Sequence, residues 1–240
     1  NDDPNPTITF ADNVTPGTCP QESVITRTWT ATDTSGNSSS CLQTITLEDS
    51  TAPVITCPAD VTIECDESTG LSNTGNATAT DNCDLNPAID FADSVASGTC
   101  PQESTIARTW AATDACGNSS SCDQTITVDD STAPVVTCPA DVAIECDDST
   151  DPSNTGSATA TDNCDLDPAI TFNDSVAVGS CSQESTITRI WTATGGCGNV
   201  STCDQIITIV DATAPVITSC PADVTLECGT GPAGTGPECL

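Results

Sequence analysis

The chain is 240 residues long, carries a formal net charge of −32 and contains neither histidine nor lysine, its three cations being Arg27, Arg108 and Arg189. These absences exclude an imidazole general base, a Ser-His-Asp triad and a lysine Schiff base, so we expect no enzyme. The acidic charge argues against nucleic acid as a partner, and no apolar run approaches the length needed for membrane insertion.

The predicted elements are all β-strands. Short runs rich in Thr, Val and Ile alternate with clusters of Gly, Pro, Asn and Asp, and no segment has helical periodicity. Taken in chain order between 53 and 130, strands are expected near residues 54–57, 60–65, 77–80, 88–95, 104–113 and 122–128. Because side chains alternate along a strand, Arg108 and Trp110 share one face of the fifth strand. Contact between the guanidinium and the indole ring there would hold one edge of the core in place, which indicates a structural role for this pair.

This pattern repeats about every 81 residues. TAPVITCPADVTIEC at 51–65 returns as TAPVVTCPADVAIEC at 132–146 and as TAPVITSCPADVTLEC at 213–228. Boundaries at the TAP linkers give a partial domain at 1–48 that lacks its first strands, complete domains at 53–130 and 134–211, and first strands alone at 215–240. We expect tandem immunoglobulin-like β-sandwiches stapled by disulfides.

Several motifs of the unit resemble one known family. TCPADVT, followed by ATATDNCD, RTWTATDTSGN and SSCLQTITL, is similar to the hyalin repeat, and the resemblance covers essentially the whole chain. It implies immunoglobulin-like extracellular modules, found in tandem in bacterial surface proteins and in some animal adhesion proteins, with no catalytic residues to transfer. The 17 cysteines fit an extracellular or cell-surface location, because disulfides persist in oxidising compartments.

The cysteines suggest three disulfides in each complete unit. The first unit lacks two cysteines together, since Asp2 and Ser35 stand at the positions of Cys83 and Cys116, which suggests that these two form a pair. In an immunoglobulin-like sandwich, Cys57 at the first strand would lie near Cys122 at the last, as the resemblance also implies, and Cys65–Cys100 remains. The full expected set is Cys57–Cys122, Cys65–Cys100, Cys83–Cys116, Cys138–Cys203, Cys146–Cys181 and Cys164–Cys197.

The two ends of the chain are complementary to each other. Cys19 and Cys41 need partners upstream and Cys220 and Cys228 need partners downstream, which suggests Cys220–Cys41 and Cys228–Cys19 bonds between copies. Either the chain is a slice of a longer repeat protein, or each subunit donates its C-terminal strands to the next in a head-to-tail homopolymer. No partner is assigned to Cys239.

Acidic residues at the linkers are calcium candidates, because carboxylate oxygens are ligands of hard cations, although the sequence contains no EF-hand. A solvated acidic surface is the alternative. These candidates are Glu48, Asp49, Asp129, Asp130 and Asp211. No other cofactor is expected.

Covalent glycans are a further expectation. The N-x-[ST] sequons lie at Asn13, Asn37, Asn76, Asn118, Asn173 and Asn199, and Asp-Ser sites for O-linked sugars lie at Ser50, Ser94, Ser131 and Ser175.

Together these features predict a structural, non-enzymatic protein: a subunit or segment of an extracellular fibre or adhesin stalk whose C-terminal strands complete the next copy. The alternative is a cell-surface adhesin module that binds a glycan or another ligand.

Overall fold

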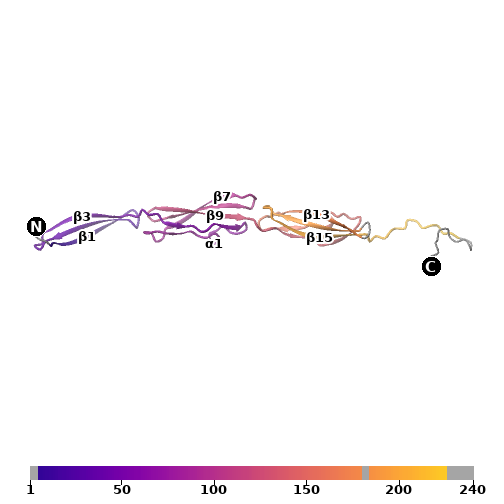
Figure 1. The fold of residues 1–240 in the computed structure, drawn as a ribbon, viewed down its shortest axis with the longest axis horizontal. Coiled ribbons are helices and arrows are strands. Elements are labelled where there is room, and N and C mark those ends of the chain that lie inside the picture. Colours follow the sequence, from indigo (N-terminus) through magenta and orange to yellow (C-terminus); the bar gives the residue numbers. More distant parts are fainter. Residues whose placement is uncertain (1–4, 180–183, 226–240) are drawn as a thin grey trace.

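The chain forms a row of β-domains. The computed structural model describes residues 5–179 and 184–225. Three β-domains follow one another along the long axis, and residues 211–225 extend beyond the third without regular structure (Figure 1). The all-β prediction is confirmed, since the helices among the described residues are two four-residue turns, α1 (Leu71–Thr74) and α2 (Pro152–Thr155).

The second domain is a sandwich of two small sheets. One sheet has the order β5-β9-β8-β7, made of β5 (Val61–Glu64), β9 (Ser119–Asp129), β8 (Ser104–Thr113) and β7 (Ala88–Ser97). The other pairs β4 (Val54–Thr56) with β6 (Thr78–Thr80). β5 runs parallel to β9, whereas the other pairs are antiparallel. These strands lie where the sequence predicts them.

The core of this domain is aliphatic and small. Ile63, Ile106, Ile126 and Val128 form one buried cluster, with Val61 packed against it. Because β5 contributes Ile63 and Val61, the first strands of the unit cover one side of the apolar cluster that β8 and β9 present. The core is therefore incomplete without them.

The third domain repeats this architecture. Its larger sheet has the order β11-β15-β14-β13, made of β11 (Val142–Glu145), β15 (Val200–Val210), β14 (Ser185–Thr194) and β13 (Ala169–Val178). The smaller sheet pairs β10 (Val135–Thr137) with β12 (Thr159–Thr161). Its core is a cluster of three isoleucines, Ile144, Ile187 and Ile207.

The first domain is a single sheet. β1 (Thr7–Pro16), β2 (Ser23–Thr32) and β3 (Ser38–Leu47) are antiparallel, and no fourth strand joins them among the described residues. On β8 alternate residues are buried, but every residue of β2 is only half-buried and β3 is almost wholly exposed. The face that is a core in the other domains is here open to solvent.

Two disulfides lie inside domains, as the sequence suggests. Cys57 is bonded to Cys122, and Cys138 to Cys203. Each links the end of the first strand to the last strand of the same domain.

The other disulfides join neighbouring domains, which corrects the expected pairing. They are Cys19–Cys116, Cys65–Cys164 and Cys100–Cys197. The expected bonds that they replace are Cys65–Cys100, Cys83–Cys116, Cys164–Cys197 and the inter-copy Cys228–Cys19.

Strand direction explains this correction. β8 runs from the turn that holds Cys100 to the turn that holds Cys116, and β5 lies parallel to β9, so Cys65 reaches the same end as Cys100. Cys83 precedes β7 and lies at the opposite end, beside Cys116. That opposite end faces the preceding domain, so the Cys83 and Cys116 positions take partners from the unit before.

Four described cysteines carry no disulfide, namely Cys41, Cys83, Cys146 and Cys220. Cys146 was expected to pair with Cys181, which lies outside the described residues, as do Cys228 and Cys239.

Candidate assembly interface and domain junctions

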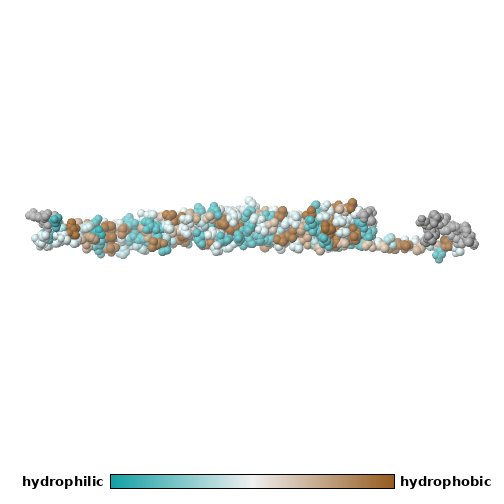
Figure 2. All heavy atoms as spheres, turned by 60° about the horizontal axis from the view of Figure 1, so that its bottom comes forward, coloured by the Kyte–Doolittle hydropathy of each residue, from teal (hydrophilic) through white to brown (hydrophobic). Residues whose placement is uncertain are grey.

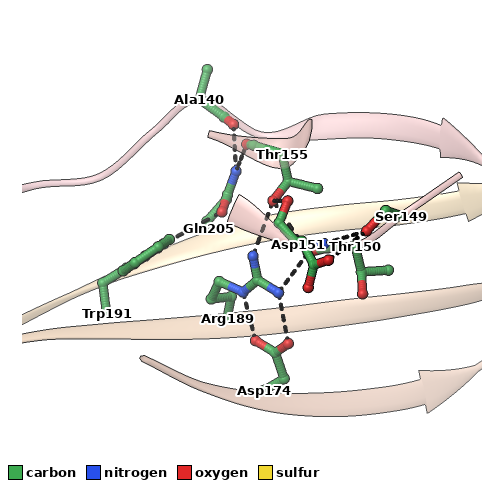
Figure 3. Close-up of polar contacts among 9 residues, drawn as sticks. All are labelled: Ala140, Ser149, Thr150, Asp151, Thr155, Asp174, Arg189, Trp191 and Gln205. Atoms are coloured by element: carbon green, nitrogen blue, oxygen red, sulfur yellow. Dashed lines mark hydrogen bonds and ion pairs between the residues drawn. The ribbon is translucent and has the colours of Figure 1, made fainter. Parts of the chain in front are cut away.

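A buried arginine fastens the first strands and loops of each complete domain to its larger sheet. In the third domain, Arg189 on β14 donates from Nε and Nη2 to Asp174 on β13 at 2.7 and 2.8 Å (Figure 3). It also donates to Thr155 Oγ1 at 3.0 Å and to the Thr150 carbonyl at 2.8 Å. The hydrogen bond to Asp174 raises the pKa of Arg189, which stays charged. Its side chain is 2% exposed.

A glutamine completes the same connection from β15. Gln205 is buried and donates from Nε2 to the carbonyls of Thr155 at 2.6 Å and Ala140 at 3.1 Å (Figure 3). Its Oε1 accepts a hydrogen bond from Trp191 Nε1 at 3.4 Å. Because buried polar groups are costly unless they are bonded, this network specifies where residues 140–155 must lie on the sheet.

The second domain repeats the arginine contacts and the glutamine-to-carbonyl contacts, but Trp110 Nε1 and Gln124 Oε1 are buried without a hydrogen-bond partner among the described residues. Arg108 bonds to Asp93 at 2.7 and 2.8 Å, to Thr74 Oγ1 at 2.9 Å and to the Thr69 carbonyl at 3.1 Å. The guanidinium holds the pKa of Asp93 below its ordinary value. Gln124 donates to the carbonyls of Ala59 and Thr74.

The first domain has the same side chains without the covering strands. Arg27 donates from Nε and Nη2 to Asp12, both at 2.8 Å, but its side chain is 25% exposed. Trp29 donates to Gln43 at 2.9 Å, on a face that solvent reaches. An open hollow of about 410 Å³ lies against Trp29, Ile8 and Cys41. We call the face formed by Arg27, Trp29, Cys41 and Gln43 the open face.

Residues 213–225 carry the sequence that covers the equivalent face elsewhere. Apart from the inserted Ser219 they are identical to 51–62, and they differ from 132–143 only where that stretch has Val136 and Ala143. All of them are exposed, including Val216, Ile217 and Val224. In Figure 2 apolar residues are visible along the thin segment beyond the third domain. Three exposed aliphatic side chains in an unpaired segment form an apolar surface of the kind that is typically buried against another protein surface.

The two free cysteines of the open face and this segment have bonded counterparts. Cys41 occupies the position of Cys122, and Cys220 occupies the position of Cys57, which is bonded to Cys122. The expected Cys220–Cys41 bond would join two copies, and in the single chain both thiols are exposed and unbonded. Cys83 likewise has the position of Cys164, whose partner is Cys65.

The junctions between domains are held by more than cystines. Asn118 donates from Nδ2 to the Asp49 carbonyl at 2.9 Å, and Asn199 donates to the Asp130 carbonyl at 2.6 Å. Pro53 and Pro134 are fully buried. The linkers are therefore packed into the following domain, and the domains follow one another in an elongated row (Figure 1).

The calcium candidates differ in their surroundings. Asp49 and Asp130 are buried at the junctions, whereas Glu48 and Asp211 are exposed and Asp129 is half-buried. Sequence reasoning missed Asp81 and Asp114, which lie beside Asp49. The repeated TDNC motif and the Asp that follows the Trp strand in the first two units, at Asp33 and Asp114, were the available signals.

The glycosylation candidates also divide into two groups. The amides of Asn118 and Asn199 are engaged at the junctions, so a sugar there would displace the linker. The exposed candidates are Asn13, Asn37, Asn76, Asn173, Ser50, Ser94, Ser131 and Ser175.

The fold and its junctions define a rod of tandem immunoglobulin-like β-domains. No protein-family model and no curated protein matches the chain. Solved structures that are similar include the protocadherin GammaB4 extracellular domain (13% identity, 84% of this chain and 43% of that chain, TM-score 0.33). Another is the protocadherin gammaB7 EC3-6 cis-dimer (13% identity, 85% of this chain and 68% of that chain, TM-score 0.34). A third is Drosophila N-cadherin EC1-4 (14% identity, 86% of this chain and 67% of that chain, TM-score 0.31). The chain thus spans less than half of the first of these, and likeness at this level assigns neither family nor function.

Within the described residues neither helix is long or apolar enough to cross a bilayer.

Proposed function

We propose that the chain is a non-enzymatic structural subunit of an extracellular fibre of the hyalin-repeat type, in which residues 213–225 of one copy cover the open face of the next. One observation carries the proposal. The first domain leaves its open face uncovered, while the segment with the covering sequence lies exposed at the other end of the same chain. A contact between opposite ends of identical copies does not close on itself, so it yields a filament.

The second domain supports specific contacts for the donated segment. There the Asp60 carboxylate accepts the amide of Thr125 at 2.7 Å, and the Ala59 carbonyl accepts Gln124 at 2.9 Å. In the donated segment, Asp223 and Ala222 are equivalent to Asp60 and Ala59. In the acceptor's first domain, Thr44 and Gln43 are equivalent to Thr125 and Gln124. Val224 would take the place of Val61 over the apolar cluster.

Two disulfides between copies would lock this arrangement. Cys220 would pair with Cys41, as Cys57 pairs with Cys122. Cys228, which lies outside the described residues, would pair with Cys83 of the acceptor's second domain, as Cys65 pairs with Cys164. Each bond forms by exchange with a small-molecule disulfide, which receives both thiol hydrogens and leaves as two thiols.

Gel electrophoresis of the native material with and without reductant tests the proposal. We expect a ladder without reductant that collapses to a single band at 24.3 kDa with it. A species that stays far larger after reduction would show one continuous chain and refute donation between subunits. Disulfide mapping by mass spectrometry should recover a peptide that links Cys41 to Cys220.

Cysteine variants sharpen the test. The double variant Cys41→Ser, Cys83→Ser should run as monomer without reductant, because both acceptor thiols are gone. Cys146→Ser is the matched control: its thiol is also exposed and unbonded, but it faces no donated cysteine. Its ladder should be that of the wild type, and an equal loss in both variants would contradict the assignment.

A further inference from the structure

Three aspartates converge at the junction of the first and second domains. Asp49 lies in the linker after β3, Asp81 follows β6, and Asp114 follows β8. One carboxylate oxygen of each lies within 4.8 Å of the others. Asp49 is 6% and Asp114 is 5% exposed, so the cluster is enclosed.

Two of these carboxylates each have one buried oxygen that accepts no hydrogen bond from the described residues. Asp49 Oδ2 and Asp81 Oδ2 are buried and have no hydrogen-bond partner among the described residues. Their second oxygens are held by backbone amides, Asp81 Oδ1 by Cys83 at 2.9 Å and Asp84 at 2.8 Å, and Asp49 Oδ1 by Thr51 at 3.3 Å.

Asp114 is held in the same way. Its Oδ1 accepts the amides of Cys116 at 2.9 Å and Asn118 at 2.8 Å, and its Oδ2 accepts Asn118 Nδ2 at 2.9 Å. The backbone thus orients all three carboxylates.

Nothing positive balances the cluster. The three arginines pair with Asp12, Asp93 and Asp174, and Arg108, the arginine nearest in sequence, lies six residues before Asp114 in the middle of β8, about 20 Å away at ~3.3 Å per residue. The nearby group is the Cys83 thiol, whose pKa is raised by loss of hydration and by the charges of Asp49 and Asp81. Enclosed carboxylates without a counter-charge are costly, so a bound cation would stabilise this cluster.

We propose that Asp49, Asp81 and Asp114 bind one calcium ion. Calcium takes carboxylate oxygens at about 2.3–2.6 Å, so two ligand atoms of one ion can lie up to about 5 Å apart, which the cluster satisfies. Zinc is disfavoured because the site offers no histidine and one thiol, and magnesium because it demands a near-ideal octahedron. The ion would tie the linker residue Asp49 to two loops of the second domain and so stiffen the junction.

The second junction supplies an internal comparison. Asp130 and Asp162 repeat Asp49 and Asp81, and their Oδ2 atoms are likewise buried without a hydrogen-bond partner within residues 5–179 and 184–225. The position of Asp114 is occupied by Gly195, however, and in the part of the chain that the structure describes the group that forms there consists of Glu64, Asp130 and the disulfide-bonded Cys164 instead of three carboxylates. The Cys65–Cys164 bond holds this junction in addition to Cys100–Cys197. Tight calcium binding is therefore assigned to the first junction.

Calorimetric titration of the chelator-treated full chain with calcium tests the proposal. We expect one tight site per chain. Asp114→Asn keeps the shape and the acceptor for the amides of Cys116 and Asn118 but removes a charge, and should weaken binding about tenfold or more. Asp90→Asn removes an exposed charge from β7 outside the cluster and should leave binding unchanged.

Gly195→Asp provides a gain-of-site variant that does not depend on a loss of folding. A Cβ at Gly195 would approach Pro134 Cγ at 3.5 Å, an ordinary contact, so the change fits. We expect it to raise the stoichiometry from one tight site to two. The proposal is overturned if the chain binds no calcium, if Asp114→Asn binds as tightly as Asp90→Asn, or if Gly195→Asp adds no site. These outcomes do not depend on whether copies assemble.

Discussion

Replacing Arg108 with alanine should open the second domain, because this one side chain connects both layers. Its guanidinium is buried and bonds to Asp93 on β7, to Thr74 on α1 and to the Thr69 carbonyl before it. Alanine would leave the Thr69 carbonyl and the Thr74 hydroxyl without a donor and Asp93 without its counter-charge. The loops between β5 and β6 would then lose their main polar attachment to β8.

The magnitude follows from these contacts. The two hydrogen bonds to Thr69 and Thr74 contribute about 1 kcal/mol each, and slightly more because the donor is charged. The ion pair adds less than a fully buried one, since Asp93 is 30% exposed and regains water. The sum is about 3 kcal/mol, which corresponds to roughly 100-fold faster exchange of amides that are released by opening of the domain.

Hydrogen–deuterium exchange of the full chain, read by mass spectrometry at the peptides of β8 and β2, measures this effect. The matched control is Arg27→Ala in the first domain, where the guanidinium is partly exposed and bonds to Asp12 without a loop above it. It should change the exchange of β2 little. Equal effects of the two substitutions would refute the idea that the covering loops make the difference.

Three further outcomes are expected. Acid should destabilise the second domain, because Arg108 lowers the pKa of Asp93 below its ordinary value of 3.8 in the folded state. The stabilisation by this ion pair is therefore present above about pH 4 and is lost as the pH falls further. Thermal melts of the wild type and of Arg108→Ala across this pH range would measure the difference. Asn118→Ala should free the linker, since its amide holds the Asp49 carbonyl, and speed exchange of residues 49–53. Gly75→Ala should cost about 1–2 kcal/mol in denaturant unfolding, because φ is +92° there.

The strands could be predicted because their signals are local. The stretch expected at 104–113 has the bounds of β8, and the turns around it are marked by Gly and Pro. The shared face of Arg108 and Trp110 follows from alternation, and both are buried on one side of β8. The carboxylate partner of Arg108 was not predictable in this way, because it depends on the register of β7 against β8, which places Asp93 opposite it.

The expected Cys57–Cys122 and Cys138–Cys203 bonds are confirmed, whereas the pairing of Cys65, Cys83, Cys100 and Cys116 was wrong for a different reason. The joint absence of cysteine at Asp2 and Ser35 identifies two positions that act together, but it does not say that they bond to each other. Cys83 and Cys116 lie at the same end of the domain. Cys116 bonds to Cys19 of the preceding domain, and Cys164, the equivalent of Cys83, bonds to Cys65, while Cys83 itself is unbonded. The convergence of Asp49, Asp81 and Asp114 was hidden similarly, because it arises only when two domains meet.

This pattern of cystines has a mechanical consequence for the proposed fibre. In the proposed fibre, the third domain of one copy is followed by the first domain of the next copy. That first domain has Asp2 and Ser35 at the positions where cysteines would have to pair with Cys146 and Cys181, so this junction between copies has no cross-domain disulfide. It is also the junction where the donated segment continues the backbone of the third domain, so the peptide chain itself bears the load.

The free thiols lie instead where the backbone is interrupted. Cys41 and Cys83 both belong to the acceptor copy, and each is placed to hold a different point of the donated segment. Withdrawal of that segment along the fibre axis would require both bonds to break together, because neither thiol shares a partner with the other. In the proposed fibre, covalent bonds would therefore carry a pulling force along the whole length. Peptide bonds carry it within each copy, and disulfides carry it from one copy to the next.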